Sequence, residues 1–180
     1  GLYQRASLGR LPVARGDSAI ADADSLVLGK CLVQETSPLP PTLALFEPFE
    51  DSIRLLGLDT QLTDAGQLSV TLHWQAIGKI AGDYTVFTHL VDPATGRIVA
   101  QQDNLPQHGT YPTWLWSPGE IVLDRYELRL PDDYGRYTLH IGMYNGSNGQ
   151  RLKLKNAVGD FVAVPLRVVE GRLQLSGDVP

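Results

Sequence analysis

The sequence predicts an all-β fold, a two-layer antiparallel β-sandwich whose strand order is either immunoglobulin-like or jelly-roll-like. Between residues 68 and 155, several segments place apolar side chains at every second position, the period of a strand with one face on a core. Strong turn signals separate these segments, and no run of ten or more residues has helical periodicity. Both strand orders fit these patterns, so the sequence leaves the choice between them open.

The clearest strand is predicted over residues 68–75, where Leu68, Val70, Leu72 and Trp74 alternate with polar side chains. We therefore expect Trp74 in the core. Residues 84–92 are apolar on both faces, which is typical of a central strand. The sequence Asp92-Pro-Ala-Thr-Gly96 then predicts a turn into a strand over 98–103.

A proline-rich loop follows and leads into another strand. The loop ends in Ser117-Pro-Gly-Glu120, a sequence that fits a type II turn. Residues 121–130 alternate apolar with charged side chains, which predicts a strand with Arg125, Glu127 and Arg129 facing solvent.

Two further strands are predicted over residues 137–144 and 161–169, the second interrupted or placed at an edge by Pro165. Two Asn-Gly pairs between them mark a reversal into residues 151–155. The alternating cations there, Arg151, Lys153 and Lys155, indicate a charged outer face or a guarded edge strand. Contact with anionic lipid is the weaker alternative.

The chain is predicted to divide near residue 45. Residues 46–176 form the sandwich domain, whose first strand is expected over 49–59. Residues 1–45 form an N-terminal segment with a short strand over 26–34 and a Pro-rich connector over 36–42. The first residue is Gly rather than Met, which indicates that a preceding segment has been removed.

Composition narrows the possible functions. The net charge of −5 and the scattered basic residues argue against a nucleic-acid surface. Cys31 is the only cysteine, which excludes an internal disulfide and a cysteine-based zinc site. No segment approaches the roughly 20 continuous apolar residues of a membrane span. We expect no cofactor.

Several short motifs together resemble a known module. They are SIRLLG at 52–57, LHWQ at 72–75, DYTVFTHL at 83–90, YPT at 111–113, WSPGE at 116–120, GRY at 135–137 and GMY at 142–144. This series resembles the C-terminal β-sandwich module of bacterial membrane glycosyltransferases that are similar to protein mannosyltransferases. The resemblance covers residues 46–170. It implies a non-catalytic, extracytoplasmic accessory domain attached to a membrane protein, with the transferase chemistry elsewhere in that protein.

The loop aromatics are the main candidate for ligand binding. Flat rings at Tyr111, Trp114 and Trp116 are suited to stacking on sugar faces, and Gln102 and Asn104 are nearby donors and acceptors for hydroxyl groups. This set predicts a glycan-binding platform. The alternative is that Trp114 and Trp116 fold under the loop and plug one end of the sandwich.

Catalytic and metal sites are weakly supported. Glu120 with Asp124, or Asp132 with Asp133, are the carboxylate pairs that a small glycoside hydrolase would need, but turn carboxylates are common. A nucleophilic Ser or Cys motif is absent from the sequence. Of the histidines, His73 and His140 are expected to face outward, and their spacing does not require a shared zinc ion. We therefore expect no catalytic residue and no metal ligand.

Overall fold

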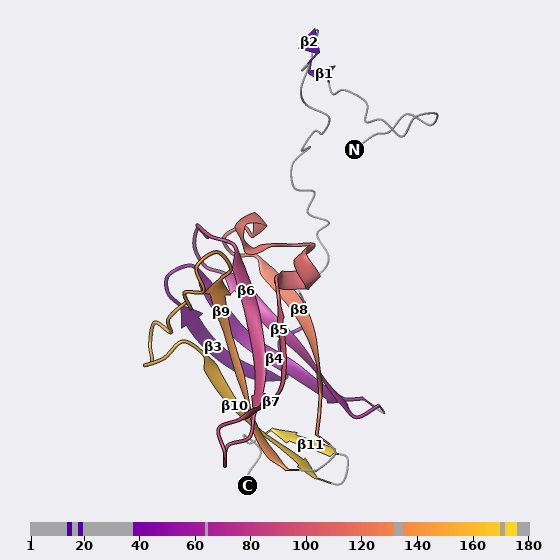
Figure 1. Cartoon of the computed structure of the whole chain (residues 1–180). Helices are drawn as coiled ribbons and strands as arrows, with labels where there is room; N and C mark the ends of the chain where they lie inside the picture. The colour runs from indigo at the N-terminus through magenta and orange to yellow at the C-terminus, as the bar shows by residue number, and fades with distance from the viewer. Residues whose placement is uncertain are drawn as a thin grey trace, which may run out of the picture. The chain divides into compact units, whose positions relative to one another are not determined.

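The fold is a β-sandwich made of two antiparallel sheets, as predicted (Figure 1). The computed structural model describes residues 14–15, 18–19, 38–63, 65–131, 135–169 and 172–175. Within these, the four-stranded sheet has the order β3-β4-β5-β8 and the five-stranded sheet the order β11-β10-β9-β6-β7. The strands are β3 (Leu43–Phe49), β4 (Ile53–Leu62), β5 (Gln67–Ala76), β6 (Tyr84–Val91), β7 (Ile98–Asn104), β8 (Ile121–Arg129), β9 (Arg136–Asn145), β10 (Val162–Val169) and β11 (Arg172–Leu175).

The chain comprises two compact units, residues 1–35 and 36–180. The first contains two short paired strands, β1 (Ala14–Arg15) and β2 (Ser18–Ala19). The second contains the whole sandwich. The strand predicted over residues 26–34 and the first two residues of the Pro-rich connector lie outside the described residues.

The core lies between the sheets, and the period-two pattern explains its composition. On β8, Val122, Tyr126 and Leu128 are buried, while Arg125 and Glu127 are exposed. Trp74 is fully buried as predicted and contacts the Phe49 ring edge-on, with the ring centroids 5.8 Å apart. Inward side chains from both sheets join one hydrophobic cluster.

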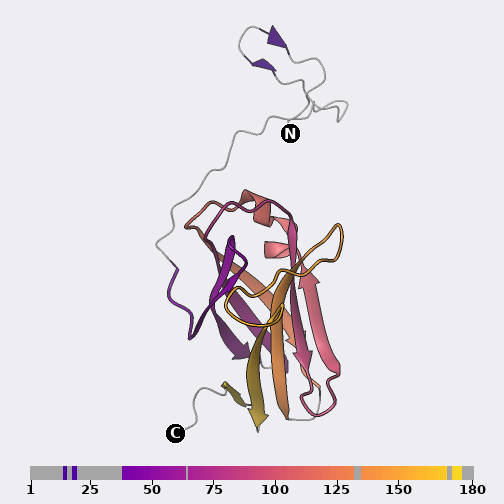
Figure 2. The same cartoon turned by 90° about the vertical axis from the view of Figure 1, so that its left-hand side faces the viewer.

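The strand order places the connections in two groups. Strands β3, β4 and β5 form a meander, whereas β6 and β7 belong to the opposite sheet, and β8 returns to pair with β5 (Figure 2). Because neighbouring strands are antiparallel, residues 50–52, 77–83, 105–120 and 146–161 lie at one end of the sandwich. We call this the loop end.

The first sandwich strand differs from the prediction. The segment expected as one strand over 49–59 contains a reversal at residues 50–52, between β3 and β4. Phe49 and Ile53, on either side of that turn, are both fully buried. The apolar pattern therefore continues across the turn and gives no sign of the reversal. Strand β3 begins at Leu43, before the boundary predicted near residue 45.

Residues 151–155 are not a regular strand, although they do close an edge. Arg151 bridges to Tyr144 of β9 and Leu154 bridges to Phe49 of β3, so the segment joins the two sheets. All three predicted cations are paired with carboxylates: Arg151 and Lys153 with Asp160 at 3.4 and 2.9 Å, and Lys155 with Asp51. This pairing fits the predicted guarded edge.

Candidate functional site: the loop end of the sandwich

Backbone hydrogen bonds hold the segments of the loop end together. Glu120 O accepts from Ala76 N at 3.0 Å, and Gly119 N donates back to Ala76 O at 2.7 Å. Ser52 O accepts from Ile77 N at 2.8 Å. Three connections that are distant in sequence therefore form one hydrogen-bonded surface on which a side chain can be held in a defined position.

The β7–β8 connection contains two short 3-10 helices, η1 (Pro106–Gly109) and η2 (Thr113–Leu115). Thr113 anchors η2 and is fully buried. Its hydroxyl accepts from Tyr84 N and donates to Gly82 O, each at 3.0 Å. The sequence showed Thr113 only as the last residue of the YPT motif at 111–113 and did not predict its anchoring role.

Trp116 is a second anchor for η2. Its side chain is 5% exposed and belongs to the core, and its indole N–H donates to Tyr111 O at 3.1 Å. Tyr111 packs against the core, and its hydroxyl donates to Glu120 Oε1 at 2.6 Å. Trp116 is therefore the plug that the alternative interpretation expected, and its ring is not available as part of a three-ring platform.

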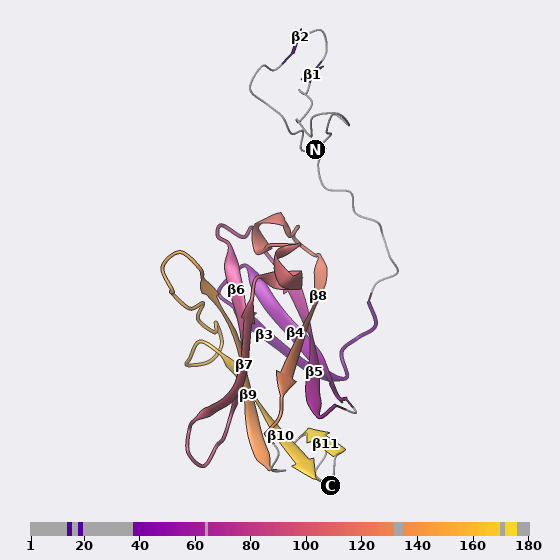
Figure 3. The same cartoon turned by 45° about the vertical axis from the view of Figure 1, so that its right-hand side comes forward.

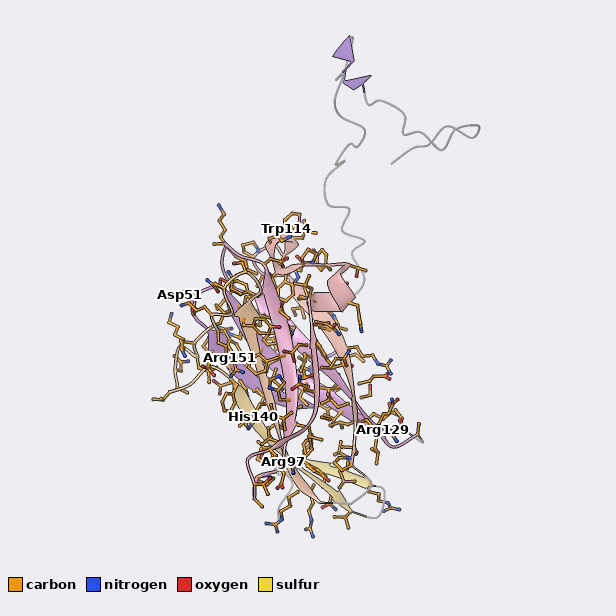
Figure 4. The ribbon with its side chains drawn as sticks, in the orientation of Figure 1. Asp51, Arg97, Trp114, Arg129, His140 and Arg151 are labelled. Carbon is orange, nitrogen blue, oxygen red and sulfur yellow. The ribbon has the colours of Figure 1, made fainter. Side chains whose placement is uncertain are left out.

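Trp114 lies between these anchors but points outward. It is 58% exposed, and it lies at the end of the sandwich opposite Arg97 and Arg129 (Figure 4). Since Thr113 and Trp116 are fixed in the interior, the turn cannot bury the Trp114 side chain without breaking one of these anchors. The plug interpretation is thus wrong for Trp114.

Gln102 and Asn104, the predicted polar contacts, belong to β7. The Gln102 side-chain oxygen accepts from Glu127 N at 2.7 Å, and the Gln102 backbone carbonyl accepts from the buried Thr88 hydroxyl at 2.9 Å. Gln102 therefore links the edge strands of the two sheets. Asn104 is half-buried and pairs with Val86 on β6.

Asp124 is a buried carboxylate that the alternation places in phase with Val122 and Tyr126. It accepts from the Tyr126 hydroxyl at 2.5 Å and from Gln107 N at 2.8 Å. Burial raises the pKa of Asp124, although these hydrogen bonds act in the opposite direction. Gln107 and His108 both adopt left-handed backbone conformations, with φ of 50° and 56°, where η1 covers the carboxylate.

The predicted carboxylate pairs do not form a shared site in the described structure. Glu120 accepts from Tyr111 and from Ser117 N at 2.8 Å, whereas Asp124 bonds to Tyr126 and Gln107. Each carboxylate thus has its own set of hydrogen-bond donors. The alternative pair, Asp132 and Asp133, lies outside the described residues.

His73 corrects one prediction. It occupies an outward position of β5, opposite Gly57, but it is only 3% exposed. A Cβ added at Gly57 would lie 2.7 Å from Pro41 Cγ, so the chain before β3 covers this part of the sheet. His73 Nε2 lies 2.7 Å from Asp59 Oδ2. Burial alone would raise the pKa of Asp59. The hydrogen bonds from Thr42 and His73 have the larger effect, so the pKa of Asp59 is lowered overall.

The other two strand histidines face outward across the β6–β9 pair. His89 bonds to Asp103 at 3.0 Å, and the His140 ring stacks on Phe161 with the centroids 4.1 Å apart. Burial lowers the pKa of His140, and the nearby charges of His89 and Arg151 lower it further. Among the described residues, no group of three or more His, Cys, Asp or Glu side chains could hold a metal ion.

Comparisons with known proteins give little beyond the fold. No family model matches the chain, and no curated protein matches it. A β-glucuronidase from glycoside hydrolase family 2 is one similar solved structure, with 14% sequence identity and a TM-score of 0.38. The similarity covers 66% of this chain and 11% of that chain. In the described part of the chain, none of the helices is long and apolar enough to cross a membrane.

Proposed function

We propose that this chain is a non-catalytic accessory β-sandwich whose loop end contacts another molecule, with Trp114 as the central contact. The observation that supports the proposal is the contrast at η2, where Trp114 is 58% exposed between the buried Thr113 and the buried Trp116 that follows the helix. A tryptophan held in solvent loses favourable apolar burial unless something covers it. Tryptophan is also among the residues that contribute most often to binding energy at interfaces.

A glycan is one candidate for that contact. An exposed indole offers a flat apolar face for the C–H face of a sugar ring, and its edge can donate a hydrogen bond. In this variant of the proposal, the site is Trp114 alone with the polar groups around it, because Trp116 and Tyr111 pack into the core. Gln102 is already engaged with Glu127.

The membrane portion of the same parent protein is the other candidate. The resemblance to modules of protein-mannosyltransferase-like glycosyltransferases implies an extracytoplasmic domain of a bacterial envelope protein. On this variant, the loop end positions the domain against its own membrane part. The sequence of the full-length gene product tests this context directly, because it should contain a series of membrane spans.

A glycan array with three proteins tests the binding role. We expect the natural chain to bind a defined subset of glycans and Trp114→Ala to lose at least about tenfold in affinity, as expected for a binding hot spot. Phe46→Ala is the matched control, because Phe46 is 61% exposed but lies in β3. This control should bind like the natural chain.

Two outcomes would contradict the proposal that the loop end binds a glycan. One is a lack of binding across the array, and the other is equal binding by all three proteins. Crosslinking of the full-length protein through a photoreactive residue at position 114 tests the other candidate. If the loop end contacts the membrane portion, we expect adducts with that portion. Adducts with neither a glycan nor the membrane portion would reject the contact role of Trp114.

A further inference from the structure

Two arginines face each other at the end of the sandwich opposite Trp114. Arg136 of β9 and Arg167 of β10 are direct partners in the antiparallel register. Figure 3 shows β9, β10 and β11 side by side at this end. Both arginines are exposed, and they occupy positions that alternate with inward-facing residues, so both point away from the core.

The register brings these two side chains as close as a strand pair allows. Val168 N donates to Gly135 O at 2.9 Å, which makes that pair a hydrogen-bonded one. Since hydrogen-bonded and non-hydrogen-bonded pairs alternate, Arg136 and Arg167 form a non-hydrogen-bonded pair. Pro165, which has no N–H, occupies the next such position opposite Thr138, as this alternation requires. Side chains approach more closely in non-hydrogen-bonded pairs.

Neither arginine has an opposite charge within ion-pair distance among the described residues. This differs from the other end of β9, where Arg151 and Lys153 share Asp160, and from β8, where Arg125 bonds to Glu127 at 3.1 Å. Like charges directly opposite each other destabilise a strand pair. In the described part of the chain, no carboxylate offsets this like-charge contact, and an anion bound between the two guanidinium groups would offset it.

A groove with suitable donors adjoins the pair. Besides the two arginines, it is lined on the same face by Thr138 of β9 and Gln174 of β11, the residue opposite Arg167. Guanidinium groups bind oxyanions through paired N–H donors, and hydroxyl groups add further hydrogen bonds. Two adjacent cations can balance a doubly charged tetrahedral anion, whereas a single carboxylate balances only one of them.

We propose that Arg136 and Arg167 form a binding site for a phosphate or sulfate group. The group could belong to a small anionic ligand or to the headgroup of an anionic lipid, because the same oxygen atoms would be recognised in both. The site is independent of the proposed role of Trp114, since it uses different residues at the opposite end of the domain.

Titration of the full chain with inorganic phosphate tests the site. We expect saturable shifts in the NMR amide signals of Thr138 and its neighbours, and a melting temperature that rises with phosphate but not with sodium chloride at equal ionic strength. Arg136→Gln and Arg167→Gln should each weaken phosphate binding by at least about tenfold, as expected when a charged hydrogen-bond partner is removed. Without phosphate, neither change should lower the melting temperature, because each removes a like-charge contact.

Arg129→Gln is the matched control, because Arg129 is also exposed and lies at a strand end, on β8 opposite Gln67. It has the same charge change and should bind phosphate like the natural chain. An equal loss of phosphate affinity in all three variants would mean a general effect of net charge and would overturn the proposal. A response to phosphate no larger than that to chloride would overturn it as well.

Vesicles then identify the source of the group. Sedimentation with phosphatidic acid vesicles, compared with phosphatidylcholine vesicles, should show binding that depends on both arginines if a lipid headgroup is recognised. Binding of phosphate in solution without vesicle binding supports a small anionic ligand. Binding of neither phosphate nor phosphatidic acid rejects the site.

Discussion

At the scale of single residues, burial gives ordinary side chains unusual properties. Asp124 has a raised pKa because it is buried beneath η1, even though two donors stabilise its charged form. Asp59 has a lowered pKa, since its bonds to Thr42 and His73 outweigh its partial burial. Two aspartates of one domain therefore respond to acid in opposite ways.

Replacing Asp124 by Asn should remove a pH dependence of stability. The folded-state pKa of Asp124 is raised, so the folded protein retains this proton longer than the unfolded chain, whose ordinary value is 3.8. As the pH rises from 3.8 through the folded-state pKa, the free energy of unfolding should fall in the natural protein relative to Asp124→Asn.

Urea unfolding of both proteins at a series of pH values measures this difference. Asparagine has the same shape and can still pair with Tyr126 and Gln107. The other titrating groups are common to both proteins and cancel in the difference. A difference that stays constant with pH, or that changes in the opposite direction, would contradict the raised pKa of Asp124.

Gly142 should not tolerate a side chain. A Cβ at this position would overlap the Phe87 ring and lie 2.6 Å from Asp160 O. Phe87 is only 1% exposed on the outer face of its sheet, and the Arg151 guanidinium lies 4.4 Å above its ring. We expect Gly142→Ala to lower the free energy of unfolding by about 1–3 kcal/mol through overpacking.

Gly146→Ala serves as the control in thermal unfolding, because the nearest atom to a Cβ there is Thr85 Oγ1 at 3.5 Å. This variant should unfold within about 0.5 kcal/mol of the natural chain. Similar melting temperatures for Gly142→Ala and the natural protein would mean that Phe87 and the 151–160 segment can move apart easily.

At the scale of an element, η2 and the residue that follows it combine buried and exposed side chains within four positions. Thr113 and Trp116 are buried and hydrogen-bonded, while Trp114 is exposed. A 3-10 turn rotates successive side chains by about a third of a turn, which is why neighbours differ so much in exposure. The loop therefore depends on its anchors for its shape.

Stability measurements on the two tryptophans should separate these roles. Trp116→Ala should cost about 3–5 kcal/mol, the usual loss for a buried aromatic side chain, because it also removes the indole bond to Tyr111. Trp114→Ala should change the free energy of unfolding by less than about 0.5 kcal/mol. Chemical denaturation of both variants measures the contrast, and comparable losses would show that Trp114 also supports the fold.

At the scale of the whole molecule, the sandwich depends on residues before its first predicted boundary. Thr42 donates from its backbone N–H and its hydroxyl to Asp59 at 2.7 and 2.6 Å, and Pro41 lies against Gly57. These contacts cover the His73 side of the four-stranded sheet. They extend the structural domain toward Thr36, where the second compact unit begins.

Two truncated chains test this boundary. Residues 36–180 should unfold at the same temperature as the full chain, because this unit contains every strand from β3 to β11. Residues 46–180 lack Thr42 and the start of β3. The free energy of unfolding of this chain should be lower by about 2 kcal/mol or more, because two hydrogen bonds to the Asp59 carboxylate are lost. Equal melting temperatures for the two truncated chains would show that residues 36–45 contribute nothing to the fold.

The strands were predictable because their signal is local. A strand turns its side chains to alternate faces, so burial on one face leaves a period of two that is readable over residues 68–75 and 121–130. The same period placed Asp124 on the inward face, although it was not recognised there as a buried group. The Asn-Gly and Pro-Gly pairs marked turns for an equally local reason, the backbone angles that these residues permit.

The sequence by itself therefore determined the fold class, the position of Trp74 in the core and most strand limits. The tertiary structure alone decided which loop aromatic is exposed, that His73 is covered, and that Arg136 faces Arg167. Each of these depends on a partner distant in sequence, such as Pro41 near Gly57 or Gln107 on Asp124. Alternation along one strand specifies which face a side chain occupies, but only the pairing and packing of other segments decide what covers that face.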